Sequence, residues 1–273
     1  STSNECSVGG TLYDIGGRSG AGVTAIDRNN PITLAIIKNW ASGDDVSYCD
    51  VSSLTDLSNA FSGEQNFNQD IGTWDTSNVT TIANIFSIAQ AFNQDISGWD
   101  VSSVNSMTGA FYGAEAFNQN IGSWNTGSVT SLSQLFYGAR AFNKDIGSWN
   151  TSNVTSLFQA FYGAIAFNQD VRAWVTTNVT TYASMFENAT AMASTYTGIT
   201  GFGDTPTSSF FNGNSESLNA PVADAGSNQT VSSAATVTLD GSGSSDADGN
   251  SITYAWSQTS GTSVTLSSST ASQ

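Results

Sequence analysis

The stretch AFNKDIGSW at residues 141–149 decides the fold, because the middle of the chain repeats it with little change. Tryptophan returns every 25 positions, at Trp74, Trp99, Trp124, Trp149 and Trp174. Phenylalanine keeps the same spacing, at Phe61, Phe86, Phe111, Phe136, Phe161 and Phe186. A fixed period of this length is typical of solenoids, in which each unit buries its apolar face against the next. The sequence therefore predicts a solenoid of about six 25-residue coils over residues 51–192.

Within one repeat, the spacing of apolar residues predicts two short elements. Residues 129–139 carry apolar side chains that would share one face of a short helix, namely Val129, Leu132, Leu135, Phe136 and Ala139. Gly138 suits the left-handed residue that ends a helix, as do Gly63, Gly113 and Gly163 at the same place in other repeats. Ile146 and Trp149 would then point inward from a short strand, which pairs in parallel with its neighbours at about 4.8 Å.

Composition and charge narrow the function classes. The 273 residues are 38% hydrophobic and 11% aromatic, enough for a core, but 22 acidic against 6 basic residues give a net charge of −16. Nucleic acid is therefore not an expected partner. The acidity suits divalent cations or a salty medium, or it serves only to keep the surface hydrated.

The chain contains no histidine, which removes the commonest general base, the usual serine-protease triad and most catalytic zinc sites. Only carboxylates remain for catalysis. A glycosidase needs two carboxylates across a cleft, about 5–10 Å apart. The acids here recur in evenly spaced columns instead, so we expect no enzyme.

Residues 1–50 precede the repeats and are expected to cap the first coil. They hold both cysteines, Cys6 and Cys49, for which a disulfide is expected, with two free thiols as the alternative. Residues 32–40 resemble a short amphipathic helix that begins after Pro31. No apolar run reaches about 18 residues, so we expect neither a membrane span nor an uncleaved signal segment.

Three polar columns follow from the period. One is Asn68, Asn93, Asn118, Asn143 and Asn168, expected to bond one another and the turn backbone. Another is Asp70, Asp95, Asn120, Asp145 and Asp170, expected to be solvated or backbone-bonded turn residues, with a cation ladder as the alternative. The third is Thr76, Thr126, Thr151 and Thr176, explained by turn chemistry, although regular hydroxyl columns can also bind ice or glycan.

The period stops after Met192, and residues 193–220 read as a C-terminal cap and linker. Residues 221–273 follow a different pattern, with alternating strands expected at 230–239 and 251–258 around a turn-rich connection at 241–250. This pattern favours a partial antiparallel β-sandwich, shorter than the usual ≈100 residues.

Four aspartates gather near the turns of this last segment, at Asp224, Asp240, Asp246 and Asp248. Oxygen ligands without histidine or spare cysteine select hard cations, so calcium is the expected ion. Gly249 permits the sharp bend that would let backbone carbonyls join such a site. A solvated acidic loop is the alternative.

Two resemblances follow from these motifs. The phrase FNQDIGTWDTSNVT at residues 67–80 resembles the BspA-like, leucine-rich-repeat-related repeats of bacterial and microbial-eukaryote surface lipoproteins and adhesins, and the likeness covers residues 32–192. Residues 221–273, with ADAG at 223–226, LDGS at 239–242 and YAW at 254–256, resemble the PKD-type β-sandwich of secreted microbial proteins. Both resemblances imply a secreted or cell-surface protein, and neither brings a fixed set of functional residues.

The expected function is a non-catalytic extracellular protein for adhesion, or for assembly into a surface layer or filament. Its partners would be copies of itself, other surface proteins or glycans. One alternative is a glycan- or ice-binding module that uses the threonine column or the side chains of Tyr112, Tyr137 and Tyr162. A carboxylate-based glycoside hydrolase is the other.

Overall fold

The computed structural model describes residues 5–8, 11–14, 23–25, 37, 45–211, 222–232, 235–245, 253–265 and 270–272, with the backbone alone in the strands at 5–8, 11–14, 23–25 and 270–272. The chain divides into two compact units, Ser1–Gly213 and Asn214–Gln273.

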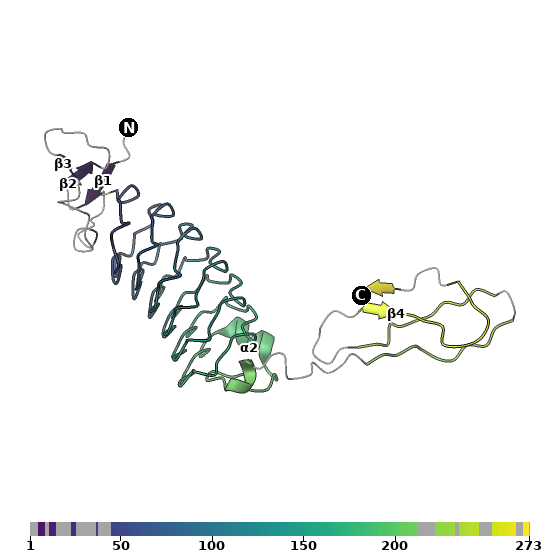
Figure 1. The fold of residues 1–273 in the computed structure, drawn as a ribbon. Coiled ribbons are helices and arrows are strands. Elements are labelled where there is room, and N and C mark those ends of the chain that lie inside the picture. The colour runs from purple at the N-terminus through teal and green to yellow at the C-terminus, as the bar shows by residue number, and fades with distance from the viewer. Residues whose placement is uncertain are drawn as a thin grey trace. The chain divides into compact units, whose positions relative to one another are not determined.

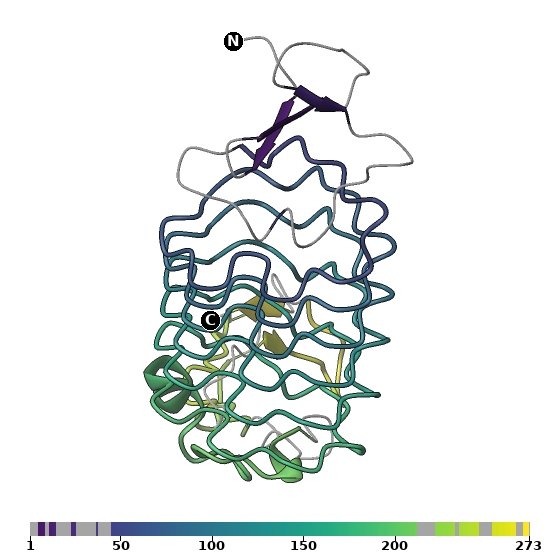
Figure 2. The same ribbon diagram turned by 90° about the vertical axis from the view of Figure 1, so that its left-hand side faces the viewer.

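Successive 25-residue coils of the first unit stack in register (Figures 1 and 2). Parallel bridges join residues at the same place in neighbouring coils, from Asp56 through Thr81, Ser106, Ser131 and Ser156 to Thr181. Beside each bridge, alternate backbone N–H groups donate to carbonyls of the next coil. In one coil the donors and acceptors are Leu132 to Ser156, Gln134 to Phe158, Phe136 to Ala160 and Gly138 to Tyr162, at 2.7–3.1 Å. We call this segment, residues 56–63 and its equivalents, the ladder.

The ladder occupies the half of the repeat that was expected to be helical, and that expectation was wrong. Residues 129–139 form consecutive turns. Their alternate N–H groups bond to the next coil instead of to the carbonyl four residues earlier. Gln134 and Gly138 have positive φ angles of 55° and 64°, a conformation that a right-handed helix excludes. The left-handed glycines predicted at Gly63, Gly113, Gly138 and Gly163 are confirmed.

Each coil advances in three-residue steps between buried side chains. The N–H of Leu135 donates to the carbonyl of Leu132, that of Ala139 to Phe136, and that of Phe142 to Ala139, at 3.1–3.2 Å. The three-residue spacing between apolar positions therefore reflects a succession of turns, each of which places one apolar side chain inward. A helix would need a mean spacing of about 3.6 residues.

The parallel strand expected at Ile146 and Trp149 is also absent from the described coils. A turn occupies residues 147–148, and the backbone N–H of Trp149 bonds to Ile146 in its own coil. The physical reason is distance: tryptophan rings of neighbouring coils are 6.3–6.4 Å apart, wider than the roughly 4.8 Å of paired strands.

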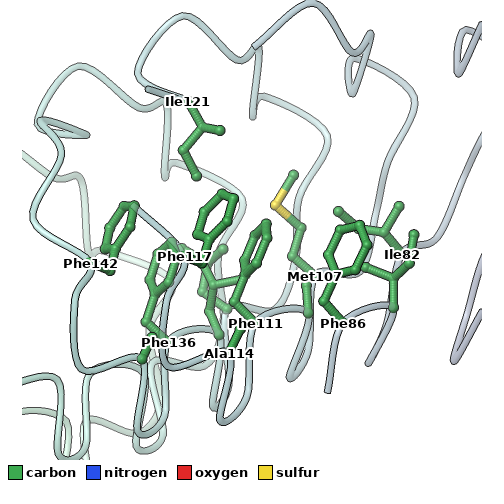
Figure 3. Close-up of a cluster of buried hydrophobic side chains, with 14 of the residues drawn as sticks. Ile82, Phe86, Met107, Phe111, Ala114, Phe117, Ile121, Phe136 and Phe142 are labelled. Atoms are coloured by element: carbon green, nitrogen blue, oxygen red, sulfur yellow. The ribbon is translucent and has the colours of Figure 1, made fainter. Parts of the chain in front are cut away.

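Aromatic rings fill the core in columns that run from coil to coil. Phe86, Phe111 and Phe136 follow one another at 5.4–5.7 Å, and each stacks on a second phenylalanine of its own coil at 3.7–4.1 Å (Figure 3). The predicted burial of Trp124 and Trp149 is confirmed, because each is only 4% exposed. Identical residues meet because the coils are related by translation along the stack.

The spacing of these columns shows that the stack is curved. Corresponding rings of the half-buried ladder tyrosines Tyr112, Tyr137 and Tyr162 are 4.4 and 4.6 Å apart. The column of buried ladder phenylalanines that begins at Phe61 has spacings of 5.4–5.9 Å, and the tryptophan column has spacings of 6.3–6.4 Å. Neighbouring coils are therefore closest on the ladder side, which becomes the inner face of the curve.

Short elements occupy the two ends of this unit. Strands β1 (Glu5–Val8), β2 (Thr11–Asp14) and β3 (Val23–Ala25) form a small sheet in which β1 and β2 are antiparallel and β2 and β3 are parallel. The helix expected at 32–40 lies outside the described residues, apart from the buried Ile37. After the last coil, helix α2 (Thr190–Tyr196) and the 3₁₀ helix η1 (Ser208–Phe211) cover Phe186, which Phe210 contacts edge-on at 5.8 Å.

In the described residues of the second unit, β4 (Thr253–Ala255) pairs antiparallel with β5 (Thr270–Ser272), and an antiparallel bridge joins Val222 and Ser245. β4 lies within the strand predicted at 251–258. The strand predicted at 230–239 is not formed in the described part of that segment. Several apolar side chains of this unit are exposed, namely Val222, Val231, Leu239 and Val264 at 63%, 51%, 44% and 65%. The β-sandwich stays a prediction.

Candidate functional site

Three stacked tyrosines, Tyr112, Tyr137 and Tyr162, form a strip on the inner face. Each follows a buried phenylalanine of the ladder and is half-buried. Their rings are nearly parallel, with interplanar angles of 8° and 4° at centroid distances of 4.4 and 4.6 Å. The strip is local, because the same place holds Ser62 and Ser87 in earlier coils and glutamate in the last. We call these three residues the tyrosine strip.

Hydrogen-bonded polar side chains accompany the tyrosine strip on the ladder. The Oγ atoms of Ser133 and Ser156 are 2.6 Å apart, and Thr108 pairs with Ser131 at 2.8 Å. The side-chain amide of Gln134 donates to Oε1 of Gln159 over 2.9 Å. These bonds join side chains of neighbouring coils and so hold the surface around the rings in a fixed conformation.

Apolar and charged groups lie around the C-terminal end of the tyrosine strip. Phe158 and Ile165 flank Tyr162 along the chain and are 38% and 41% exposed. Glu187 stands in the column of the tyrosines, one coil further on. Glu115 and Arg140 occupy the same place in neighbouring coils, at the turn after the ladder, and both are exposed. The carboxylate of Glu115 accepts a hydrogen bond from the side-chain amide of Gln90 at 3.2 Å. The surface therefore combines aromatic, hydroxyl, amide and charged groups.

Packing keeps the phenol of Tyr137 neutral. Burial raises the pKa of Tyr137, and the neighbouring phenols of Tyr112 and Tyr162 raise it further. A raised pKa keeps this hydroxyl protonated at physiological pH. The hydroxyl of Tyr137 can therefore both donate and accept a hydrogen bond.

The asparagine column is structural, as the sequence suggested. Oδ1 of Asn68 accepts the backbone N–H of Asn93 at 2.9 Å, and the pattern continues to Asn168 at 2.9–3.1 Å. Gln94 adds bonds from its amide to the carbonyl and side chain of Asn68. These amides are occupied by contacts between coils.

The aspartate column makes local turns. Oδ1 of Asp70, Asp95, Asn120, Asp145 and Asp170 each accepts the N–H of the residue two positions later, at 2.9–3.2 Å. Asn120 makes the same bond as its acidic counterparts, so the bond does not require a charge. Backbone bonding, one of the two expected roles, accounts for this column.

The threonine column cannot form a hydroxyl surface for ice or glycan. Thr76, Thr126 and Thr151 are at most 2% exposed. Each hydroxyl donates to a carbonyl of the next coil at 3.0 Å. Thr176, in the last of these coils, is partly exposed, so a single hydroxyl of the column is accessible. Of the two surfaces considered for that function, only the tyrosines form an accessible column.

One ion pair lies near the end of the stack in the described residues. Arg172 contacts Asp170 at 2.8 Å, and its guanidinium lies 5.6 Å from the ring centroid of Tyr196 in α2. Hydrogen bonding from Arg172 lowers the pKa of Asp170. This cluster joins the last coils to α2 and has a structural role.

The predicted disulfide and calcium sites remain predictions. Cys49 is 4% exposed, and the side chain of Cys6 in β1 lies outside the described residues. Asp246 and Asp248 also lie outside them. Asp224 and Asp240 each accept a hydrogen bond from the N–H of the residue two positions later, at 2.8 and 2.9 Å. In the described part of the chain, no group of three or more acidic, histidine or cysteine side chains is placed to hold a metal ion.

The tyrosines were visible in the sequence as a column, but their stacking and their place on an inner face were not. The available signal was a large aromatic residue beside a buried phenylalanine in three consecutive repeats. The expectation of a helix instead placed them on a helix flank. The ladder found in place of that helix is what brings their rings together.

Comparison with known families gives two matches. Residues 34–131 and 119–221 match a family described as Mycoplasma protein of unknown function, DUF285. Residues 225–273 match the K319L-like PKD domain. No curated protein and no solved structure matches the chain. The two family matches support surface-protein repeats followed by a PKD-type domain.

Among the residues that the structure describes, no helix is long and apolar enough to cross a bilayer. The repeats carry the family assignment, because the matches together span residues 34–221. The chain belongs to the DUF285 family through its stacked 25-residue coils.

Proposed function

We propose that this chain is a non-catalytic extracellular protein that adheres to a partner through its inner face. The tyrosine strip is the observation that carries the proposal, because Tyr112, Tyr137 and Tyr162 present aromatic surface that the core does not use. Curved stacks of repeats offer extended concave surfaces suited to binding. The repeat family and the PKD-type domain support a location at the cell surface.

The repeated acids do not favour catalysis. The aspartates of the repeated column serve as turn acceptors at 2.9–3.1 Å, each bonded within its own turn, namely Asp70, Asp95, Asp145 and Asp170. A glycosidase would need two carboxylates facing a shared cleft. Adhesion therefore accounts for the surface better than hydrolysis does. The leucine-rich-repeat relation is part of the proposal, supported by the parallel ladder on the inner face.

A binding assay with beads tests adhesion. Beads that carry the full chain would be applied to a panel of surfaces coated with matrix proteins or glycans, next to beads with Tyr112→Ser, Tyr137→Ser and Tyr162→Ser combined. Serine already occupies this place at Ser62 and Ser87, so the coils accommodate it. We expect retention of the wild type on some surfaces and its loss in the variant. Equal retention of both, or of neither, would contradict the proposal.

Assembly into a layer or filament is the second candidate, and the exposed apolar side chains of the second unit favour it. Val222 and Val264 are 63% and 65% exposed. Sedimentation of the chain against a Val222→Thr, Val264→Thr variant tests this candidate. Larger species only in the wild type would support assembly through this unit, and monomers in both would exclude it under the conditions used.

A further inference from the structure

We propose that the tyrosine strip binds a basic polypeptide, an inference that rests on the adhesive function above and specifies its partner. The first step concerns the faces of the rings. Tyr137 lies between Tyr112 at 4.4 Å and Tyr162 at 4.6 Å, so both of its faces are covered. A sugar stacks on an exposed aromatic face, which the middle of this strip does not provide. Because Tyr137 is partly exposed although both faces are covered, we infer that solvent reaches its ring edge and hydroxyl.

The second step concerns what edges and hydroxyls recognise. The edge of an aromatic ring is electropositive and its hydroxyl both donates and accepts, so the strip can meet backbone carbonyls and amides. Surfaces rich in tyrosine and small polar residues recognise polypeptides, because the rings are rigid and the polar groups supply hydrogen bonds. Ser133 and Gln134 stand on the ladder in the coil of Tyr137, and their bonds to Ser156 and Gln159 fix the side chains while leaving each with further hydrogen-bonding capacity. Phe158 and Ile165 add exposed apolar area for a side chain of the partner.

The third step concerns charge. Glu187 stands in the column of the tyrosines, one coil beyond Tyr162, and the backbone N–H of Gly163 donates to its carbonyl at 2.8 Å. Its charge also contributes to the raised pKa of Tyr137. Glu115 and Arg140 lie at the adjacent turn, so the surroundings carry one more negative than positive charge. The whole chain carries a net charge of −16. Complementarity therefore favours a basic partner and opposes a second copy of this chain.

Binding to synthetic peptides tests the proposal. The full chain would be immobilised and exposed to a peptide of alternating lysine and leucine, and to the same peptide with glutamate in place of lysine. We expect binding of the lysine peptide only, weakened by salt. Because an acidic protein attracts any cationic peptide, the deciding variant is Tyr137→Ser, which leaves the charge unchanged. Loss of an interface tyrosine should weaken binding by roughly tenfold.

Matched variants separate the outcomes. Ser87→Ala, in the same column two coils before Tyr137, should leave binding of the lysine peptide unchanged. Tyr137→Phe keeps the ring and removes only the hydroxyl, so we expect its binding to lie between that of the wild type and that of Tyr137→Ser. The urea unfolding midpoint shows whether each variant is still folded. Lysine-peptide binding that is equal in wild type and Tyr137→Ser would overturn the proposal. If the tyrosines prove necessary for binding to a glycan array but not to the peptide, the polypeptide assignment fails while the adhesive function stands.

Discussion

The indole Nε1 of Trp149 donates a hydrogen bond to the backbone carbonyl of Ile121 in the preceding coil over 3.0 Å. The same bond joins every tryptophan of the repeat to the coil before it, at 3.0–3.2 Å. It lies on the outer side, where the coils are farthest apart and no strand pairing occurs. One side chain therefore supplies both buried volume and the link between coils.

Replacing this tryptophan should destabilise the stack. We expect Trp149→Ala to lower the free energy of unfolding by about 3–5 kcal/mol, because it leaves a large cavity, and it also leaves the Ile121 carbonyl without its donor. Trp149→Phe keeps much of the volume but not the N–H, so its loss should be smaller. Urea denaturation measures both. An unchanged midpoint in Trp149→Ala would contradict the role of this residue in the core.

Ile88 holds a strained backbone conformation. Its φ is 60°, whereas Gly63, Gly113 and Gly138 occupy the same place in other coils. A positive φ is unfavourable for a β-branched residue, by about 1–3 kcal/mol. Ile88→Gly should therefore raise the melting temperature, even after the entropic cost of glycine in the unfolded chain, about 0.5–1 kcal/mol.

The reverse substitution is the control for this prediction. A Cβ added at Gly138 would meet its nearest neighbour at 3.8 Å, an ordinary contact, so space is available. Gly138→Ala should still lower the melting temperature, because φ there is 64°. If Ile88→Gly and Gly138→Ala both destabilise, side-chain packing outweighs backbone strain at this turn.

Acid should weaken the coils through their turn carboxylates. The hydroxyl of Ser77 lowers the pKa of Asp75, and an equivalent bond lowers that of Asp100. Since the folded-state pKa lies below the ordinary 3.8, these carboxylates stabilise the fold above that pH, and the stabilisation is lost as pH falls through the folded value. Asn125 and Asn150 make the same turn without titrating.

The combined Asp75→Asn and Asp100→Asn variant tests this pH dependence. Its urea midpoint should fall less than that of the wild type as pH is lowered from about 5 to 2. Measurements at neutral pH show whether the turns themselves are preserved. Parallel acid profiles for the two proteins would assign the pH dependence to other carboxylates.

A disulfide between Cys6 and Cys49 should resist alkylation. Cys49 is buried at the place where later coils carry tryptophan. Mass spectrometry without reductant should find neither cysteine alkylated, and reduction should lower stability by about 4 kcal/mol. Alkylation of both residues in the unreduced, denatured chain would exclude the bond.

Calcium should bind to the second unit if Asp224, Asp240, Asp246 and Asp248 converge. Oxygen ligands alone favour such a hard cation. Calorimetry should show calcium binding to the full chain and its loss in Asp248→Asn, while Asp145→Asn in the coils serves as the control. Absence of heat on calcium addition would leave these residues as a hydrated acidic loop.

Sequence reasoning was strongest where the repeat itself constrains the answer. Translation by 25 residues forces Phe136 to meet Phe111 and Phe161, so the buried columns could be predicted before any local conformation was known. The conformation within a coil could not, because apolar residues three apart suit a helix and a succession of turns alike. The deciding residue is Gln134, whose own identity does not indicate its left-handed φ. The available signal was the asparagine or glycine at the same place in other coils, because Asn59, Asn84 and Gly109 also have positive φ.

The same ambiguity limited how much of the candidate site could be predicted from the sequence. The sequence shows Tyr112, Tyr137 and Tyr162 as a column. Their stacking depends on coils that approach one another on the ladder side. The stack curves because neighbouring coils are closer where their backbones are hydrogen-bonded than where their indole rings pack. Neither spacing can be read from the sequence of a single repeat.

The bonds between coils also bear on how such a chain can change its length. The ladder, the asparagine column and the tryptophan bonds each join residues at a constant separation along the sequence. Excising or duplicating 25 residues within the repeats would restore every one of these pairings. Unequal recombination can therefore add or remove a coil in a single event, and the reach of the protein can evolve without the redesign of a contact.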